Sequence, residues 1–367
     1  MRLRPLASTL LALAACAGPS APPPAAPPPA QPAAAPAPAP KPPGTDLALP
    51  GERHLKNVHQ LTFGGENAEG YFSFDGRRIV FQSTERGGGC DQLYVMNADG
   101  TGRHRVSSGE GRVTCGYFFP DGSRILYSST FAAGPACPPP PDRSHGYVWP
   151  LDDFTIYTAR PDGSDLRALA PAPGSYTAEA TISRDGWIVF TSTRDGDLEL
   201  YKMRLDGSGL VRLTHEEGYD GGAFFSADGK RIVYRAARAG SEEERATART
   251  LLAKKLVRPG KLEIWVMDAD GSNKRQVTHL GAASFAPFFH PDGKRIVFAS
   301  NSGDPKGRNF DLFLVNDDGT GLERVTVNDT FDGFPMFSPD GRKLVFASNR
   351  NDERPGETNL FIADWVE

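Results

Sequence analysis

Four acidic residues have a spacing that suggests a ligand-binding site. Each lies six or eight positions before an Asp-Gly pair; they are Glu69, Glu179, Asp220 and Asp332. Carboxylates that gather at one point attract cations and basic peptide segments. The spacing predicts an acidic site that could hold a divalent cation, and no other cofactor is expected. Alternatively, each carboxylate forms a local ion pair; the candidate partners are Arg86, Arg194 and Arg350.

Two groups of residues around histidines are further candidates for binding. His215 and His279 each follow a short apolar run that ends in threonine, so they occupy the same place in two successive repeats. They are either ligands that project from one face or loop residues in solvent. His145, Tyr147 and Trp149 lie in a proline-rich stretch at 131–153, where aromatic side chains are suited to contact a partner.

Cysteine chemistry points to a disulfide and not to a metal cluster. The chain has four cysteines, of which Cys16 lies in the N-terminal segment and Cys90, Cys115 and Cys137 lie in the folded region. An oxidising, exported compartment permits one disulfide among the three, which leaves one thiol unpaired. Cys137 lies in the most adaptable loop and is the favoured partner, but the sequence leaves the pairing open.

Several function classes are excluded by what the sequence lacks. It contains no G-x-S-x-G, H-E-x-x-H, paired C-x-x-C, Walker loop or G-x-G-x-x-G motif, so no reaction is assigned. Its formal net charge of −4 offers no basic surface for a phosphate backbone, and nucleic acid is not expected as a partner.

The elements that position these residues come from an internal repeat. An apolar or aromatic pair, a small residue, Asp-Gly, a basic residue and an Ile/Val/Phe run recur six times. The Asp-Gly pairs begin at 75, 121, 185, 228, 292 and 340, a period in the mid forties with two longer intervals. A second Asp-Gly follows in five units, at 99, 162, 206, 270 and 318.

Each repeat is predicted to be a four-stranded antiparallel meander. Asp-Gly supplies the positive φ angles of tight hairpins, and the flanking runs are β-branched and aromatic. Six such sheets bury their faces when packed radially, which predicts an all-β, six-bladed propeller. The sixth unit lacks its fourth strand, and an orphan strand at 54–62 precedes the first unit. We therefore expect 54–62 to pair with 359–366 and close the ring.

Both long insertions fall between the second and third strands, so they lie on the face opposite the Asp-Gly turns, which we call the insertion face. The blade 2 insertion is the proline-rich stretch at 131–153. The blade 4 insertion predicts a helix of about four turns over blades 4 and 5, beginning with a capping box at Ser241 and Glu244 and ending before Pro259. The insertions either form a binding face or only cap the blade ends. The four carboxylates begin innermost strands on this face, beside the central channel.

The repeats resemble a known family. FSPDGRKLVFASNR from Phe337 and IWVMDADGSNKRQVT from Ile264 are similar to the Tol-type WD40-like repeat of TolB-like six-bladed propellers, found in many envelope proteins. The resemblance covers residues 55–367 and implies the fold. It does not imply one function, because propellers serve many. Some propeller lyases hold a metal with histidines on the insertion face, so the resemblance keeps an enzyme as the alternative.

The N-terminal segments are predicted to export and anchor the protein. Residues 1–15 read as a signal peptide, and Leu13 to Cys16 resembles the bacterial lipoprotein box, which implies an acylated Cys16. An ordinary signal peptide cleaved nearby is the alternative. Ala17, where an aspartate would indicate inner-membrane retention, implies the outer membrane. Residues 16–50, rich in Ala and Pro, are expected to be a disordered tether, and 51–367 the propeller.

The sequence as a whole predicts a monomeric, non-enzymatic lipoprotein of the cell envelope, facing the periplasm or the cell surface. It would touch the membrane only through its lipid and bind an envelope protein or glycan on the insertion face. The alternative is a metal-dependent propeller enzyme of the lyase or hydrolase type, with its site at the channel mouth.

Overall fold

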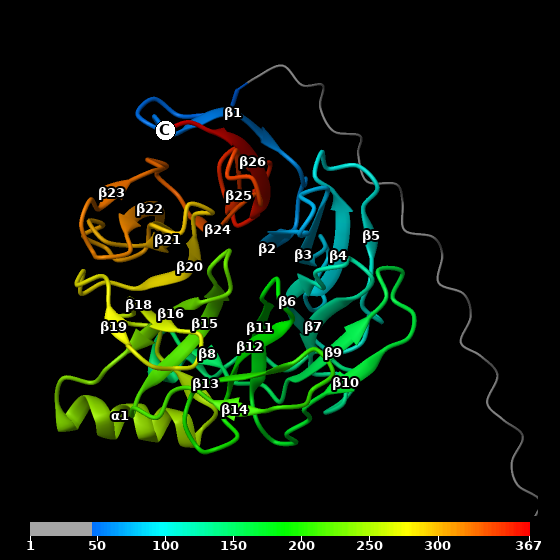
Figure 1. Ribbon diagram of the computed structural model, residues 1–367, viewed down its shortest axis with the longest axis vertical. Helices are drawn as coiled ribbons and strands as arrows, with labels where there is room; N and C mark the ends of the chain where they lie inside the picture. Colours follow the sequence, from blue (N-terminus) through cyan, green and yellow to red (C-terminus); the bar gives the residue numbers. More distant parts are fainter. Residues whose placement is uncertain (1–45) are drawn as a thin grey trace, which may run out of the picture. The chain divides into compact units, whose positions relative to one another are not determined.

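The computed structural model describes residues 46–367, and this part of the chain is the predicted six-bladed propeller of four-stranded antiparallel sheets (Figure 1). The predicted signal peptide, Cys16 and almost all of the tether lie outside the described residues. The described chain runs once round the ring, from blue through green to red in Figure 1. No helix among residues 46–367 is long and apolar enough to cross a membrane.

Each of the first five blades is a consecutive meander that runs from the channel outwards. Blade 1 is β2 Glu66–Phe72, β3 Arg78–Thr84, β4 Gln92–Asn97 and β5 His104–Arg105, and blade 2 is β6 Val113–Phe118, β7 Ile125–Ser129, β9 Thr155–Ala159 and β10 Arg167–Leu169. Blade 3 is β11 Thr177–Ile182, β12 Trp187–Ser192, β13 Glu199–Arg204 and β14 Val211–Arg212. Blade 4 is β15 Tyr219–Phe225, β16 Arg231–Ala237, β18 Glu263–Asp268 and β19 Arg275–Gln276. Blade 5 is β20 Ser284–Phe289, β21 Arg295–Ser300, β22 Asp311–Asn316 and β23 Glu323–Arg324.

Blade 6 is built from both ends of the described chain, as the sequence predicts. Its strands are β24 Asp332–Phe337, β25 Lys343–Ser348, β26 Asn359–Trp365 and, outermost, β1 Leu55–Gln60. The N-terminal strand pairs antiparallel with β26, with Leu55 opposite Trp365. Hydrogen bonds between the first and last strands thus close the ring.

The Asp-Gly pairs form the turns expected of them. In blade 1, Asp75 accepts hydrogen bonds from the Ser73 hydroxyl (2.5 Å) and from the Arg77 backbone N–H (3.1 Å). Gly76 has φ +71°, a backbone conformation that favours glycine. The turn therefore satisfies its own polar groups while it reverses the chain.

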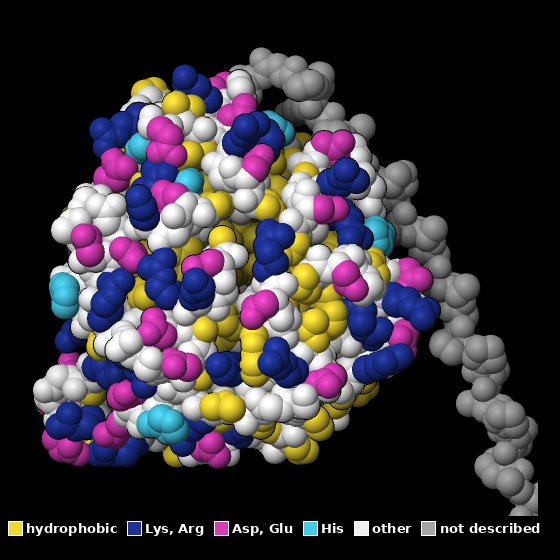
Figure 2. All heavy atoms as spheres, viewed as in Figure 1, with side chains coloured by type: hydrophobic (Ala, Val, Ile, Leu, Met, Phe, Trp, Pro, Cys, Tyr) yellow, Lys and Arg dark blue, Asp and Glu magenta, His cyan; other side chains and the backbone are white. Residues whose placement is uncertain are grey.

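Every blade carries an aromatic pair in its core. The second and third strands place two aromatic rings directly opposite each other, with ring centroids 5.7–6.4 Å apart; the pairs are Phe81–Tyr94, Tyr127–Tyr157, Phe190–Tyr201, Tyr234–Trp265, Phe298–Phe313 and Phe346–Phe361. Such cross-strand pairs stabilise each sheet. Figure 2 shows hydrophobic side chains around the centre of one face, with charges of both signs around its rim.

Candidate functional site

A bulge in each innermost strand builds the insertion-face end of the channel. Each of these strands shifts register between the residues seven and four positions before its Asp-Gly pair. In each strand the residue six positions before the pair has φ between +50° and +58°; these are Glu69, Cys115, Glu179, Gly222, Ala286 and Phe334. Together the six residues line one cavity, which Arg235 also lines. One repeated backbone distortion therefore brings one residue from every blade to the channel, with a side chain in every blade except blade 4, where the residue is Gly222.

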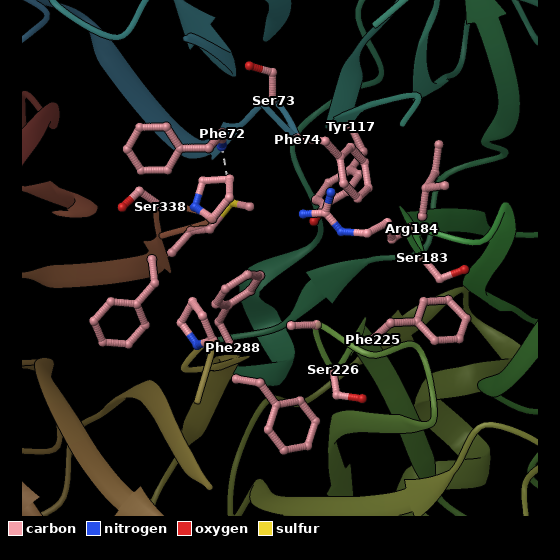
Figure 3. A pocket seen from close by; sticks show the side chains of 17 residues that line it. Phe72, Ser73, Phe74, Tyr117, Ser183, Arg184, Phe225, Ser226, Phe288 and Ser338 are labelled. Carbon is pink, nitrogen blue, oxygen red and sulfur yellow. Dashed lines mark hydrogen bonds between the residues drawn. The ribbon is translucent and has the colours of Figure 1, made fainter. Parts of the chain in front are cut away.

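An aromatic layer closes the channel beneath this cavity. Tyr71 of blade 1 meets Phe224 of blade 4, on the opposite side of the ring, with ring centroids 5.3 Å apart. Tyr117 and Phe288 complete the layer, at 5.9 Å from Tyr71 and 5.4 Å from Phe224 respectively. A second hollow lies beyond the layer at the Asp-Gly turn end of the channel (Figure 3). The propeller thus has two separate mouths and not an open pore.

Glu179 is fully partnered within the cavity, because Arg235 from β16 forms an ion pair with it. Its carboxylate also accepts hydrogen bonds from the Thr191 hydroxyl (2.7 Å) and from the Gly222 backbone N–H (2.9 Å). The Tyr219 hydroxyl accepts a hydrogen bond from Arg235 (3.0 Å) and contacts Glu179 (3.3 Å). Although burial opposes it, the charge of Glu179 and the neighbouring tyrosines raise the pKa of Arg235. This ion pair joins blades 3 and 4.

The sequence interpretation missed Arg235. The available signal was an arginine inside the apolar strand IVYRAA, where a buried charge requires a partner.

Glu69 is the acidic group of the cavity that lacks an ion-pair partner among the described residues. Its Oε2 atom is buried and accepts no hydrogen bond from them. Burial raises the pKa of Glu69 to about 7; the Glu179 charge also raises it, whereas interactions with Cys115 and Arg235 oppose the shift. Cys115 is buried beside it as a free thiol, and burial and then the Glu69 charge raise the pKa of that thiol. The cavity can therefore accept a proton or a cationic group at Glu69.

The prediction that four carboxylates ring the channel mouth is wrong for Asp220 and Asp332. Both are fully buried at the start of their strands and do not line the cavity. Asp220 pairs with Arg238 (2.6 Å) and Asp332 with Arg350 (3.0 Å). Neither position lies in the bulge that turns Glu69 toward the channel, so these two carboxylates instead form ion pairs within the structure.

Local pairing, the alternative interpretation, is confirmed for Asp220 and Asp332, but of the three candidate arginines only Arg350 is a partner. Arg86 pairs with Glu357 (2.6 Å) and Glu353 (2.8 Å) of blade 6, and not with Glu69. Arg194 forms no ion pair with a described carboxylate; it donates to the Ala170 carbonyl (3.2 Å) and lies over aromatic rings of its own blade. The pairs between blades depend on contacts that the repeat pattern does not encode.

The two insertions form one structure above the propeller. Strand β8, Trp149–Pro150, in the blade 2 insertion pairs antiparallel with β17, Leu256–Val257, in the blade 4 insertion. Helix α1, Glu242–Ala253, precedes β17, and its residue Leu251 forms a small buried cluster with Val148 and Leu256. We call this combined element the insertion bridge. It links blades 2 and 4 across blade 3.

Helix α1 starts as predicted but ends earlier and lies elsewhere. Ser241 caps it and accepts a hydrogen bond from the Glu244 N–H (3.2 Å), but the helix stops at Ala253 and Leu256 enters strand β17. The helix packs with the blade 2 insertion, and Arg249 pairs with Glu217 in the connection between blades 3 and 4 (2.6 Å). The expected position over blades 4 and 5 is wrong, because the partner of its apolar face comes from blade 2.

The structure places the predicted binding residues of the blade 2 insertion on this bridge. Tyr147 is 64% exposed, and the Trp149 indole N–H donates to its hydroxyl (3.2 Å). Trp149 is half-buried, and the Arg235 guanidinium lies 5.4 Å from its ring centroid, so the bridge extends to the cavity. His145 is held by Lys254 (2.9 Å). The aromatic residues and the cavity thus share one face.

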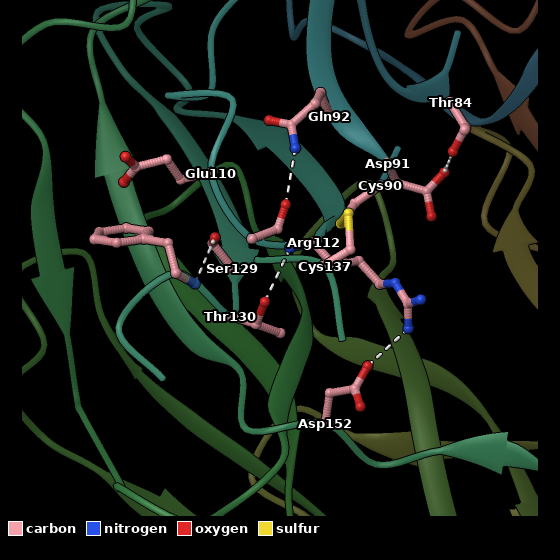
Figure 4. The surroundings of a disulfide bond; sticks show 12 residues. Thr84, Cys90, Asp91, Gln92, Glu110, Arg112, Ser129, Thr130, Cys137 and Asp152 are labelled. Carbon is pink, nitrogen blue, oxygen red and sulfur yellow. Dashed lines mark hydrogen bonds and ion pairs between the residues drawn. A yellow bond between two sulfur atoms is a disulfide. The ribbon is translucent and has the colours of Figure 1, made fainter. Parts of the chain in front are cut away.

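A disulfide joins Cys90 to Cys137 and ties the blade 2 insertion to blade 1 (Figure 4). An ion pair between Arg112 and Asp152 (2.7 Å) holds the far end of the same insertion. Cys115 is the unpaired cysteine of the described residues. The insertion is therefore fixed at both ends as well as by its pairing with β17.

His215 and His279 are exposed residues of the connections that follow blades 3 and 4. Within residues 46–367, no group of three or more His, Cys, Asp or Glu side chains has an arrangement that could hold a metal ion.

Comparison with known proteins gives the same architecture. The family model of the TolB beta propeller domain matches residues 247–355. A TolB homologue of Chlorobium luteolum is 27% identical over 183 residues, which cover 42% of each chain. The TolB crystal structure of Acinetobacter baumannii superposes with a TM-score of 0.53 at 19% identity, covering 83% of this chain and 64% of that one.

Enzymes share the fold as well. An oligogalacturonate lyase of Vibrio parahaemolyticus superposes with a TM-score of 0.50 at 14% identity, covering 87% of this chain and 96% of the lyase. The chain spans less than half the length of the curated relatives it matches. At identities this low, similarity between structures shows a shared fold but not a shared activity. The six repeats and the closed ring make residues 46–367 a six-bladed β-propeller, and the family match over residues 247–355 shows that this propeller is similar to the TolB propeller domain.

Proposed function

We propose that this protein is a non-enzymatic propeller of the cell envelope that binds a protein or glycan partner on its insertion face. The insertion bridge carries this proposal, because it places the exposed Tyr147 and the half-buried Trp149 beside an acidic cavity. Aromatic residues on a rigid surface contribute much of the binding energy at interfaces. The similarity to TolB supports an envelope location and a non-catalytic role.

The bridge is suited to binding because it is fixed before a partner arrives. The disulfide at Cys137, the strand pair at Trp149 and the buried Leu251 hold it at three points. A surface that is already ordered loses little conformational entropy on association. Tyr147 offers apolar area on this surface, and Glu69 offers an acceptor for a cationic group.

Anchoring through Cys16 completes the proposal. An acylated Cys16 followed by the Ala/Pro tether would hold the propeller at the membrane while it searches for a partner. Extended polyproline rises about 3.1 Å per residue, so the tether gives the propeller a long reach. The partner, the lipid and the outer-membrane location are all parts of the proposal.

The experiment is affinity capture from envelope extract with residues 46–367, followed by calorimetry with the captured partner. Trp149→Ala and Tyr147→Ala should each weaken binding by roughly 2 kcal/mol. Trp187→Ala is the matched control, because Trp187 is a half-buried tryptophan at the Asp-Gly turn end of blade 3. Equal losses in all three variants would assign binding to another face. Stoichiometric metal in protein purified without chelators would instead favour the enzyme alternative.

A further inference from the structure

The second mouth of the channel, at the Asp-Gly turn end, has the composition of a small ligand pocket (Figure 3). All six blades contribute to it, and most of its lining is aromatic or apolar. Its inner end lies against the aromatic layer of Tyr117 and Phe288, so a ligand there cannot thread through the ring. A concave, mostly apolar lining with few polar groups is typical of small-molecule sites.

Arg184 is the charged side chain of this pocket. It comes from the first turn of blade 3 and reaches across the mouth toward Phe74 of blade 1, with its guanidinium 5.4 Å from that ring centroid. Figure 3 shows it pointing in among the aromatic side chains. Among residues 46–367 it finds no hydrogen-bond acceptor and no ion-pair partner. Its donors therefore remain available to a ligand.

The serine hydroxyl groups of the pocket, unlike Arg184, already form hydrogen bonds within the protein. Ser73, Ser226 and Ser338 each donate to the aspartate of their own turn, at 2.5–2.6 Å, and each accepts a backbone N–H. Ser183 accepts the Trp187 N–H (2.9 Å). A sugar or a nucleotide, which needs many hydrogen bonds, would find few partners here. The pocket favours an apolar body with one anionic group.

We propose that this pocket binds an apolar monocarboxylate, with the carboxylate on Arg184 and the apolar body against Phe74, Tyr117 and Phe288. A planar guanidinium matches a carboxylate with two parallel hydrogen bonds. One arginine balances one negative charge, which favours a carboxylate over a phosphate that carries nearly two. The site lies at the mouth opposite the insertion bridge, so it is independent of the proposed function.

Two kinds of molecule present an apolar body with one carboxylate: a free small acid and the C-terminal residue of a polypeptide. The probes are 3-phenylpropionate, its uncharged amide, and an acetylated tripeptide that ends in phenylalanine. Ligand-observed NMR on the full chain should give a Kd of about 4 mM or tighter for 3-phenylpropionate, from about 0.3 kcal/mol per non-hydrogen atom. Tighter binding of the peptide assigns the pocket to protein C-termini, and tighter binding of the free acid assigns it to small metabolites.

Charge and position are tested by variants. The amide should bind at least about tenfold more weakly than the acid, and Arg184→Gln should weaken the acid by about the same factor. Arg204→Gln is the matched control, because Arg204 lies on the same blade with its guanidinium 3.7 Å from the Trp187 ring centroid, outside the pocket. Trp149→Ala should leave binding of the acid unchanged. Equal affinity for acid and amide, or an equal loss in Arg204→Gln, would overturn the proposal.

Discussion

Trp149 in the blade 2 insertion lies opposite Val257 in the blade 4 insertion, 108 positions further along the chain, in an antiparallel strand pair. The Leu151 N–H donates to the Lys255 carbonyl (2.8 Å) and extends this pairing. Two loops from blades that are not neighbours thereby become one element. The face opposite the Asp-Gly turns is consequently a built surface and not a set of independent loops.

The first prediction concerns the cooperativity of this bridge. Leu251→Ala should loosen residues 148–151 and 242–257 together, because Leu251 packs with Val148 and Leu256. Truncation of a buried leucine costs about 2–5 kcal/mol. Hydrogen exchange measured by mass spectrometry should rise in both segments and stay unchanged in the blade strands. Thr250→Ala, at an exposed position of the same helix, is the control. Faster exchange in α1 alone would show that the insertions are independent.

The second prediction concerns ring closure. Glu52 lies just before β1 and forms a buried ion pair with Arg350 (2.8 Å), which also holds Asp332. Glu52→Ala removes two buried hydrogen bonds from the Arg350 guanidinium and leaves Asp332 as its ion-pair partner, so it should cost about 3–5 kcal/mol. Thermal unfolding should show a melting temperature lower by about 5–10 °C.

Two comparisons control the closure experiment. Glu353→Ala removes an exposed ion-pair partner of Arg86 and should cost at most about 1 kcal/mol. Deletion of residues 17–45 should leave the melting temperature unchanged, whereas deletion of 51–62 should lower it sharply because β1 is lost. An unchanged melting temperature without 51–62 would contradict closure by the N-terminal strand.

The third prediction is a pH dependence at Glu69. Burial first, and then the Glu179 charge, raise the pKa of Glu69 from 4.5 to about 7 in the folded chain. A carboxyl whose pKa is higher in the folded state favours folding while it is protonated. Its contribution is therefore fully present below pH 4.5 and is lost as the pH rises to about 7.

Glu69→Gln removes this titration. Its stability relative to the wild type should rise between pH 4.5 and 7 by at most about 3 kcal/mol and then level off. Chemical unfolding of both proteins at pH 4, 6 and 8 measures the difference. A difference that is constant across this range would mean that Glu69 does not titrate in the folded protein.

The fourth prediction concerns the thiol of Cys115. Burial and the Glu69 charge raise its pKa, so the native protein should hold it as an unreactive thiol. Residues 46–367 should show almost no reaction with a thiol reagent in buffer and one reactive thiol per chain in guanidinium chloride, because the Cys90–Cys137 disulfide remains closed. Rapid labelling of the native protein would show that the cavity opens to solvent.

The fifth prediction concerns anchoring, and it falls on residues outside the described part of the chain. Cys16→Ser should release the protein from membranes and abolish palmitate labelling, because no acyl chain can then be attached. Ala17→Asp keeps the cysteine and should leave the protein on membranes, now in the inner-membrane fraction. Cell fractionation measures both outcomes. If the serine variant stays on membranes, another segment anchors the protein.

The sequence by itself determined the architecture of the propeller. Each Asp-Gly pair and the β-branched run after it act locally, so six copies of the pattern specify six hairpins without knowledge of the whole fold. The missing fourth strand of the last unit and the orphan strand before the first predicted the pairing of Leu55 with the C-terminal strand. The cap at Ser241 could also be predicted, because capping involves only neighbouring residues.

The tertiary structure alone decided which side chains share the site. Glu69 and Asp220 have similar spacing from their turns, but the bulge turns only Glu69 toward the channel. The partner of Glu179 is Arg235 on the next blade, and the partner of Trp149 is Val257, more than a hundred residues away. Such contacts join positions that no periodic pattern relates. They depend on how complete blades pack round the axis, and that packing exists only once the ring has closed.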